Sequence, residues 1–475
     1  MKRVIICLTI MVLGSFVGMN RVARADIVQT LSSKQVGNWA PPNVEVIPLK
    51  NGIKLFLLED KELPVVTGKL WLRAGDIYDP ANLLGTASLT AGLLRLGGAG
   101  ADSPDAFNAK LEDLAASIGV EVFAEYSTVS FKTLSQDLAP TLELFFTMLQ
   151  NPKMDEGRLE ILKAKAIDQL KRQNDLPGSI ASREFKKMIY GQDNIWARTP
   201  TQEMVKAIKR EDLMAFFKKY YVPNQINLAI AGNFKKSQVL ALIHKHTSSW
   251  AKSDEASLPE LPSVQRHYTP GKFFIDKQAD QATLAVGHFG DKRENPDKFA
   301  LILLNYILGG ETLTSRLGVD IRSTQGLAYA IYSDFGLNRD YGIFKVVAQT
   351  KVESAGLVIQ SILDHLQHIR EPGNIQAPEL DEAKAAFLNS LFSSYEPKFN
   401  IVAEEARFDF LGYPPHYLQI FAEKIKAVTL SDLERVAKDY LHPQGLKILV
   451  VGDGAKLNSL IHKQEWQTIQ LDKGL

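Results

Sequence analysis

The sequence predicts an α+β protein built from two homologous domains in tandem. The chain has 475 residues, which is long enough for two large domains. Hydrophobic residues make up 45% of it and charged residues 23%, as in an ordinary soluble globular protein. A unit that reads as a helix, a tight turn and an apolar strand occurs twice, and this repeat is the strongest indication of the domain organisation.

The two copies of this unit align without a gap over 28 positions. Residues 205–232 match residues 425–452 at an offset of 220. Self-similarity of such a long period indicates a duplicated domain, because two unrelated helix–strand units would rarely align so far. We expect domains at 44–252 and 271–475, joined by a linker at 253–270 that is rich in Pro, Ser, Glu and Asp. The identical residues are Lys206, Ala207, Asp212, Leu213, Lys218, Tyr220, Pro223 and Gly232, which recur as Lys426, Ala427, Asp432, Leu433, Lys438, Tyr440, Pro443 and Gly452.

Residues 1–25 predict a secretory signal peptide. Two basic residues precede an apolar run from Val4 to Met19, and Ala23–Arg24–Ala25 forms an A-x-A cleavage site. The alternative is an uncleaved membrane anchor, which would need about 20 apolar residues. The run is shorter, and no later stretch is long enough to span a bilayer. We therefore expect a secreted protein of the bacterial periplasm, in which residues 26–43 form an extended lead-in.

Charge and cysteine content agree with secretion and exclude one class of partner. The formal net charge of +1 becomes −3 when Lys2, Arg3, Arg21 and Arg24 are removed with the signal. The chain has no basic stripe, so we expect no nucleic-acid partner. Cleavage also removes Cys7, the one cysteine, and a chain without thiols suits an oxidising compartment.

Periodicity and turn chemistry predict the elements of the first domain. Asn51–Gly52 lies between two apolar runs, which is a strong hairpin signal. Ser103–Pro104 supplies an N-cap and a proline for the first helical position. The expected strands are 44–49, 53–58, two within 120–134, and 226–231; the expected helices begin near residue 86 and continue with 103–116, 138–149, 155–174, 204–220 and 238–246.

The start of the first domain resembles a known enzyme family. The residues that carry the resemblance are Asn51–Gly52, Leu63–Pro64–Val65–Val66, Arg73–Ala74–Gly75, Asp79–Pro80 and Gly85. In this order they are similar to the pitrilysin-like (insulinase-like) zinc peptidases and their mitochondrial processing peptidase relatives. The resemblance covers nearly all of the chain after the signal. It implies an antiparallel-rich sheet in each domain with helices packed on one side, and a pair of domains that forms half of a clam-shell.

The resemblance also implies where zinc would bind, and the required residues are missing. Active members carry His-x-x-Glu-His, in which the histidines bind the metal and the Glu is the general base. The matching positions hold Ser88, Ala91 and Gly92. The third ligand, a Glu about 77 residues further on in the family, corresponds to Gln169, which is neutral. We expect no zinc in this chain, and the simplest role for these small residues is helix packing.

The nine histidines do not suggest another metal site. His365 and His368 lie three apart on an expected helix at 358–370 and could share one face. No cysteine or convincing third ligand lies nearby, and the helix reads as amphipathic and solvated. His244 and His246 point in different directions on their helix. We therefore expect no metal at either pair.

The second domain retains a motif of the family. Gly309–Gly310, Ser315–Arg316–Leu317, Arg322 and Tyr329 are similar to its Gly-Gly, Ser-Arg-Leu and Arg-x6-Tyr elements. The resemblance implies that Arg322 and Tyr329 hydrogen-bond the substrate backbone and the oxyanion that forms at a zinc site opposite them. Hydrogen-bond donors held in fixed positions stabilise such developing negative charge strongly. The turn at Gly309–Gly310 resembles a shortened form of the glycine-rich loop in the non-catalytic subunit of mitochondrial processing peptidase. The alternative is that Arg322 makes a helix-end ion pair and Tyr329 is an ordinary strand aromatic.

This pattern is consistent with two classes of function. A third class is possible by family similarity, but the residues at the zinc-motif positions argue against it. The first is the non-catalytic subunit of a heterodimeric peptidase, whose partner supplies His-x-x-Glu-His and zinc and whose peptide substrate adds as a strand to an exposed sheet edge near Val120–Glu125. The second is a stand-alone periplasmic peptide-binding or scaffold protein, favoured if Arg322 and Tyr329 face a closed core. The third is a zinc metalloendopeptidase in its own right.

Overall fold

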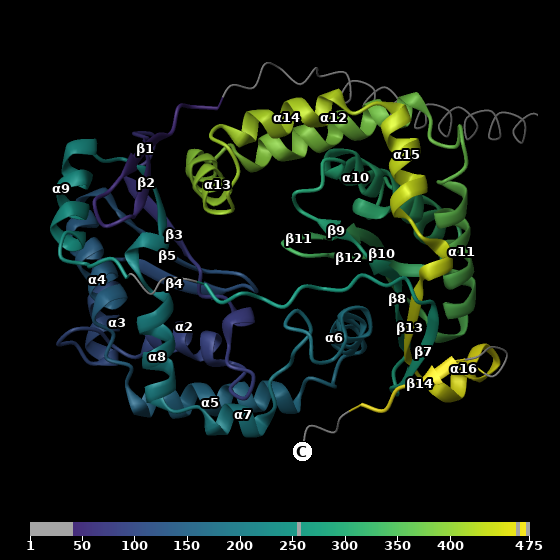
Figure 1. Ribbon diagram of the computed structural model, residues 1–475, viewed down its shortest axis with the longest axis horizontal. Coiled ribbons are helices and arrows are strands. Elements are labelled where there is room, and N and C mark those ends of the chain that lie inside the picture. Colours follow the sequence, from purple (N-terminus) through teal and green to yellow (C-terminus); the bar gives the residue numbers. More distant parts are fainter. Residues whose placement is uncertain (1–40, 254–257, 462–465, 472–475) are drawn as a thin grey trace, which may run out of the picture.

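The computed structural model describes residues 41–253, 258–461 and 466–471. The expected signal peptide and most of the lead-in lie outside these described residues. Two six-stranded sheets lie on opposite sides of the molecule (Figure 1), the first purple to teal and the second green to yellow. The helices α12 and α14 run along the top of the view, α13 lies below their left end beside the first sheet, and α6 lies lower down between the two sheets. The expected α+β class with two homologous domains is confirmed.

The first sheet has the strand order β1-β2-β6-β3-β5-β4. The neighbours β2 and β6 run parallel, and the other pairs are antiparallel. The expected hairpin at Asn51–Gly52 joins β1 to β2, and Gly52 has a φ of +95°, a value that glycine adopts without strain. The strands are β1 (Glu45–Pro48), β2 (Lys54–Glu59), β3 (Val65–Leu72), β4 (Ser117–Val122), β5 (Ser127–Leu134) and β6 (Asn227–Gly232).

Eight α-helices are described in the first half. The Ser103 side chain accepts a hydrogen bond from the Ala106 amide (3.2 Å), and Asp155 accepts one from the Arg158 amide (2.9 Å), so both helices begin at capping residues. The helices are α2 (Thr86–Leu96), α3 (Pro104–Asp113), α4 (Leu138–Gln150), α5 (Glu156–Lys171), α6 (Pro177–Tyr190), α7 (Gln202–Ala207), α8 (Arg210–Tyr220) and α9 (Lys236–Thr247).

The expectation of one helix at 204–220 is wrong. The chain is extended at Ile208 and Lys209 and then starts α8. The Asp212 side chain accepts from the Lys209 amide (2.8 Å), so the second helix has its own N-terminal cap. The second copy of the unit breaks in the same way, because Asp432 accepts from the Thr429 amide (2.9 Å) at the start of α15.

The second sheet has the order β10-β12-β8-β13-β7-β14 and repeats the layout of the first. In each sheet the strand that ends the repeated unit, β6 or β13, lies beside β2 or β7 and runs parallel to it. The strands are β7 (Gly271–Asp276), β8 (Gln281–Phe289), β10 (Ala328–Phe335), β12 (Ile343–Lys351), β13 (Lys447–Gly452) and β14 (Trp466–Thr468), with the short parallel pair β9 (Asp291–Lys292) and β11 (Leu337–Asn338) nearby.

Apart from α13, the helices of the second half pack on this sheet or on one another. The helices of this half are α10 (Lys298–Asn305), the π-helical turns η4 (Tyr306–Gly310) and η5 (Gly318–Thr324), α11 (Ala355–His368), α12 (Ala377–Ser394), α13 (Lys398–Phe410), α14 (Tyr417–Ala427), α15 (Leu430–Tyr440) and α16 (Gly454–Ile461). None of the helices in the described part of the chain is long and apolar enough to cross a membrane.

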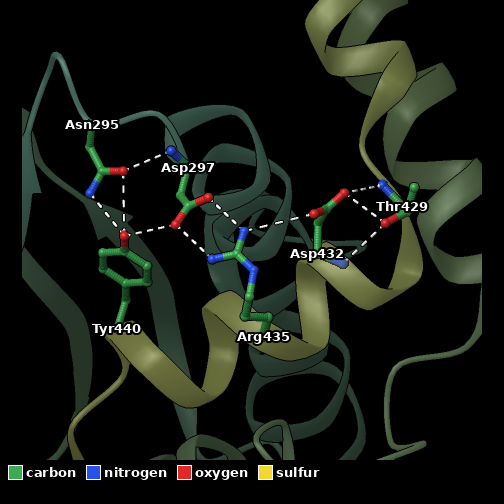
Figure 2. Close-up of polar contacts among 6 residues, drawn as sticks. All are labelled: Asn295, Asp297, Thr429, Asp432, Arg435 and Tyr440. Carbon is green, nitrogen blue, oxygen red and sulfur yellow. Dashed lines mark hydrogen bonds and ion pairs between the residues drawn. The ribbon is translucent and has the colours of Figure 1, made fainter.

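A polar cluster joins α10 to α15 (Figure 2). The Asp297 carboxylate accepts hydrogen bonds from both Nη groups of Arg435 (2.7 and 2.6 Å) and from the Tyr440 hydroxyl (2.8 Å). Asn295 lies on the other side of the Tyr440 hydroxyl, and Asp432 contacts Arg435 from the preceding turn. The cluster lies at the start of α10 and therefore ties this end of the helix to its neighbour.

Each sheet also receives one helix from the other half of the chain. Helix α13 packs on β2, β3 and β6, and α6 packs on β8 and β13. In this contact Val402 of α13 is buried with Phe56 and Trp71, which lie on the face of the first sheet opposite its own helices. Asp409 on α13 also accepts hydrogen bonds from Lys54 (2.8 Å) and Asn227 (2.9 Å). The two halves are therefore interlocked, and the domain bounds at 44–252 and 271–475 stay a prediction.

Candidate functional site

The start of α2 is held by one buried carboxylate. Asp79 Oδ2 accepts from the Gly85 amide (2.6 Å) and Oδ1 accepts from the Ala87 amide (2.7 Å). These amides have no partner inside the helix, and a negative charge here is favoured by the helix dipole. Burial raises the pKa of Asp79 to about 6, although the two amide hydrogen bonds oppose it. Arg198 donates to the Asp79 and Ile77 carbonyls (3.3 and 3.0 Å) and fixes the preceding turn.

The three positions that correspond to the zinc motif lie in different surroundings on α2. Ser88 is exposed and lines a cavity of about 570 Å³. Ala91 is 3% exposed and belongs to the core. A Cβ atom added to Gly92 would lie 3.2 Å from Leu162 Cδ1 on α5. The helix therefore offers a hydroxyl, a buried methyl group and a close apolar contact where active members need two imidazoles and a carboxylate.

Gln169 does not line the cavity at Ser88. Gln169 is exposed on α5, and the cavity is lined by residues of α2, α6, the turn at 76–79 and the segment 195–200. Its neighbour Asp168 pairs with Arg172 (3.1 Å) on the solvent side. His365 Nε2 lies 2.8 Å from an oxygen of Asp320, and His368 is exposed. Within residues 41–253, 258–461 and 466–471, no group of three or more His, Cys, Asp or Glu residues is arranged to hold a metal ion.

Arg322 and Tyr329 come together at the edge of the second sheet. The register of β10 against β12 changes between Ala328 and Ala330, so Tyr329 is the extra residue of a β-bulge. Arg322, at the end of η5, donates from Nε to the Tyr329 carbonyl (2.9 Å). The Tyr329 side chain is 51% exposed. Bulges re-aim a side chain, and here the arginine fixes the bulge that turns Tyr329 outward.

Gly309 and Gly310 have different environments. Gly309 is buried in η4, and an added Cβ would lie 2.6 Å from Ser333 Oγ and 2.8 Å from its amide nitrogen on β10. Its place is a close contact between helix and strand, so it presents no surface to a substrate. Gly310 is exposed. Arg316 of the same motif pairs through two nitrogens with Glu379 on α12 (both 2.7 Å), which anchors the segment before η5.

Sequence reasoning missed α6, which contributes much of the cavity lining. Gly178, Ser182 and Lys186 recur every four residues and so lie on one helix face. They line both the Ser88 cavity and a second one of about 210 Å³ against β8, β10 and β12. A proline at the first helical position and the apolar spacing of Ile180, Ala181, Phe185 and Ile189 were the signals that could have found this helix.

Comparison with known families identifies the class of protein. Residues 55–195 match the family model described as Insulinase (Peptidase family M16), and residues 207–387 match the one described as Peptidase M16 inactive domain. Together the two matches cover about two thirds of the chain. The chain belongs to the M16, insulinase-like family, so the expected family is confirmed.

Curated relatives and solved structures agree with this assignment. The chain is 22% identical over 390 residues to the uncharacterized zinc protease YmxG of Bacillus subtilis, covering 82% of this chain and 93% of YmxG. It is 21% identical over 430 residues to a probable mitochondrial-processing peptidase subunit beta of Arabidopsis thaliana, covering 86% and 78% of the two chains. The fold matches a peptidase M16 inactive domain from Pseudomonas fluorescens with a TM-score of 0.79 and 24% identity, over 87% of this chain and 98% of that one. It also matches the periplasmic protease PqqL of Escherichia coli with a TM-score of 0.73 and 17% identity, over 89% of this chain and 48% of PqqL.

Proposed function

We propose that this chain is the non-catalytic subunit of a secreted, periplasmic heterodimeric zinc metallopeptidase. It forms half of the chamber, binds the peptide substrate and donates Arg322 and Tyr329 to the site of a partner of the same family. That partner carries His-x-x-Glu-His and the zinc ion. The observation that carries the proposal is a contrast: α2 has neither ligand nor base at the motif positions, whereas Tyr329 is exposed and is held outward by Arg322.

The chemistry of the pair supports a role at a peptide carbonyl. Arg322 uses Nε to hold the bulge, and its two Nη groups have no partner among the described residues. A guanidinium and a phenol both donate hydrogen bonds, and they stabilise a negative oxygen when their positions are fixed before the reaction. Water activation and carbonyl polarisation would come from the partner's zinc, so this chain supplies substrate positioning and oxyanion stabilisation.

The expected peptide-binding edge supports the substrate class. The strand β4 is the last of the first sheet, and in the described residues it pairs with β5 alone. At its start the Ile118 carbonyl accepts from Arg95 (2.8 Å), and past its end the Phe123 carbonyl accepts from the Asp76 amide (3.1 Å). The residues between these points can pair with an extended peptide. The coverage of about half of PqqL is consistent with a chamber that needs a second chain.

The test is an Arg322→Ala variant assayed in the complex. A candidate partner is a chain of the same two-domain layout that carries His-x-x-Glu-His, and it is co-purified with this protein. Peptide cleavage by the complex should fall by about 10²–10³ in rate, the usual cost of one lost oxyanion donor, while size-exclusion chromatography shows an unchanged complex. The matched control is Arg172→Ala at the exposed C-cap of α5. Full activity of the Arg322→Ala complex would contradict the in-trans role and favour the peptide-binding scaffold.

A further inference from the structure

We propose that a cavity on the inner face of the first sheet binds one aromatic or large aliphatic side chain of the polypeptide held at β4. The inference rests on the proposed function, which places an extended peptide at that edge. It adds a specificity site, because backbone pairing along a strand does not select side chains, whereas a pocket beside it does.

Aromatic side chains from both halves of the chain contribute to the lining of the cavity: Trp71, Phe123 and Tyr126 from the first half, and Tyr395 and Phe399 from the second. Its volume is about 380 Å³, within the range of pockets that enclose small ligands. Trp71 of β3 is 3% exposed and forms the floor with Tyr126, whereas Phe123 at the rim is 42% exposed. Helix α13 supplies the opposite wall, which includes Phe399 and Ala403, so the cavity exists because α13 crosses onto this sheet (Figure 1).

The charges around the cavity are already paired. Lys69 Nζ lies 3.4 Å from a Glu121 oxygen, and Arg407 Nε donates to Glu404 (2.8 Å). A charged side chain entering the cavity would lose water without finding a free opposite charge. An aromatic or large aliphatic side chain would bury apolar surface and, if aromatic, contact ring faces and edges at favourable distances. The lining therefore selects an uncharged apolar residue.

The position of the cavity relative to β4 fixes which residue of the peptide reaches it. Phe123 directly follows β4, and the cavity runs from there across β5 to Trp71 on β3. Strands are about 4.8 Å apart, so a peptide added outside β4 lies three spacings, or about 14 Å, from Trp71. An extended chain advances about 3.3 Å per residue. The occupant is therefore a residue about four positions beyond the segment that pairs with β4.

The experiment measures binding of matched peptides to the full chain. Extended peptides of about ten residues carry either Phe or Ser at one position, which is moved along the peptide, and fluorescence anisotropy gives the Kd of each. At one position Phe should bind about tenfold or more tighter than Ser, as expected for burial of one aromatic side chain. Ala403→Trp fills the cavity and should abolish this preference while leaving the Kd of the Ser peptide unchanged.

Controls separate this inference from the proposed function. Ala164→Trp places the same side chain on the exposed face of α5 and should keep the preference. Phe399→Ala removes one wall and should also abolish it, which provides a second variant if Ala403→Trp does not fold as judged by its melting curve. Peptide binding with no preference at any position, or a preference that survives both cavity variants, would overturn the inference and leave the peptide-binding role standing. Failure of every peptide to bind would overturn both.

Discussion

Asp79 shows how a single residue holds the start of α2. Its carboxylate satisfies two amides at the start of the helix and is 5% exposed. This cap lies about one turn before Ser88 and fixes the start of the helix that carries Ser88, Ala91 and Gly92. Asp79 is among the residues that carry the family resemblance in the sequence. Its contacts depend on the turn at 76–85 and could not be predicted from composition.

Titration of Asp79 has a measurable effect on stability. Because its pKa is about 6 in the folded chain and 3.8 ordinarily, the folded state binds more protons between these values, and the free energy of unfolding falls as the pH rises from about 4 to about 6. At 1.36 kcal/mol per pKa unit, the free energy of unfolding changes by at most about 3 kcal/mol over this pH range. Asp79→Asn should flatten this slope in urea titrations across that pH range. Asp168→Asn, at an exposed position, should leave the slope unchanged, and an unaltered slope in Asp79→Asn would refute the assignment.

At the scale of elements, local sequence signals predicted whether a segment forms a helix or a strand. They did not predict which other element that segment packs against. The cap at Ser103 formed as expected, since it depends only on a side chain and an amide three residues apart. The break before α8 was missed although Asp212 is a cap signal, because the apolar spacing continues through Ile208. The helices α6 and α13 pack on the sheet of the other half. The apolar face of a helix can be recognised in the sequence, but the sheet against which it packs cannot.

The cluster that joins α10 to α15 (Figure 2) gives a prediction at this scale. Hydrogen bonds from Arg435 and then Tyr440 hold the pKa of Asp297 below its ordinary value. Such a carboxylate stabilises the fold above its unfolded pKa, and the contribution is lost as the pH falls through the lower folded value. Asp297→Asn should cost about 1 kcal/mol near pH 7, since the pair is partly exposed, and less at pH 3, below the ordinary pKa of 3.8. Urea unfolding at both pH values measures this, with Glu423→Gln on α14 as the surface control; an equal cost at both pH values would contradict it.

At the scale of the whole molecule, the crossing helices and a buried ion pair make one unit of two homologous halves. Arg293 donates from both Nη groups to Glu125 (2.8 and 2.7 Å), and Arg73 donates to the Phe410 carbonyl (2.8 Å). The repeat predicted two domains, and the family resemblance placed the zinc-motif and Arg–Tyr positions. Neither could predict these contacts, because they join residues more than 160 positions apart.

Interlocking of this kind predicts a single unfolding transition for the chain. Removing one member of a buried ion pair leaves the other charge unpaired and costs about 3–5 kcal/mol, so Glu125→Ala should lower the melting temperature and still give one transition. Glu121→Ala, at an exposed pair with Lys69, should cost at most about 1 kcal/mol. Calorimetry together with far- and near-ultraviolet circular dichroism measures this. Two separate transitions in the wild-type chain would show that the halves fold independently.

The central claim is that this chain holds the peptide while the metal belongs to a partner. The most direct test measures the zinc content and peptidase activity of the purified chain after incubation with zinc and dialysis. We expect well under one ion per chain and no cleavage until a partner carrying His-x-x-Glu-His is added. One tightly held zinc ion per chain, with cleavage by the chain alone that a chelator abolishes, would contradict it.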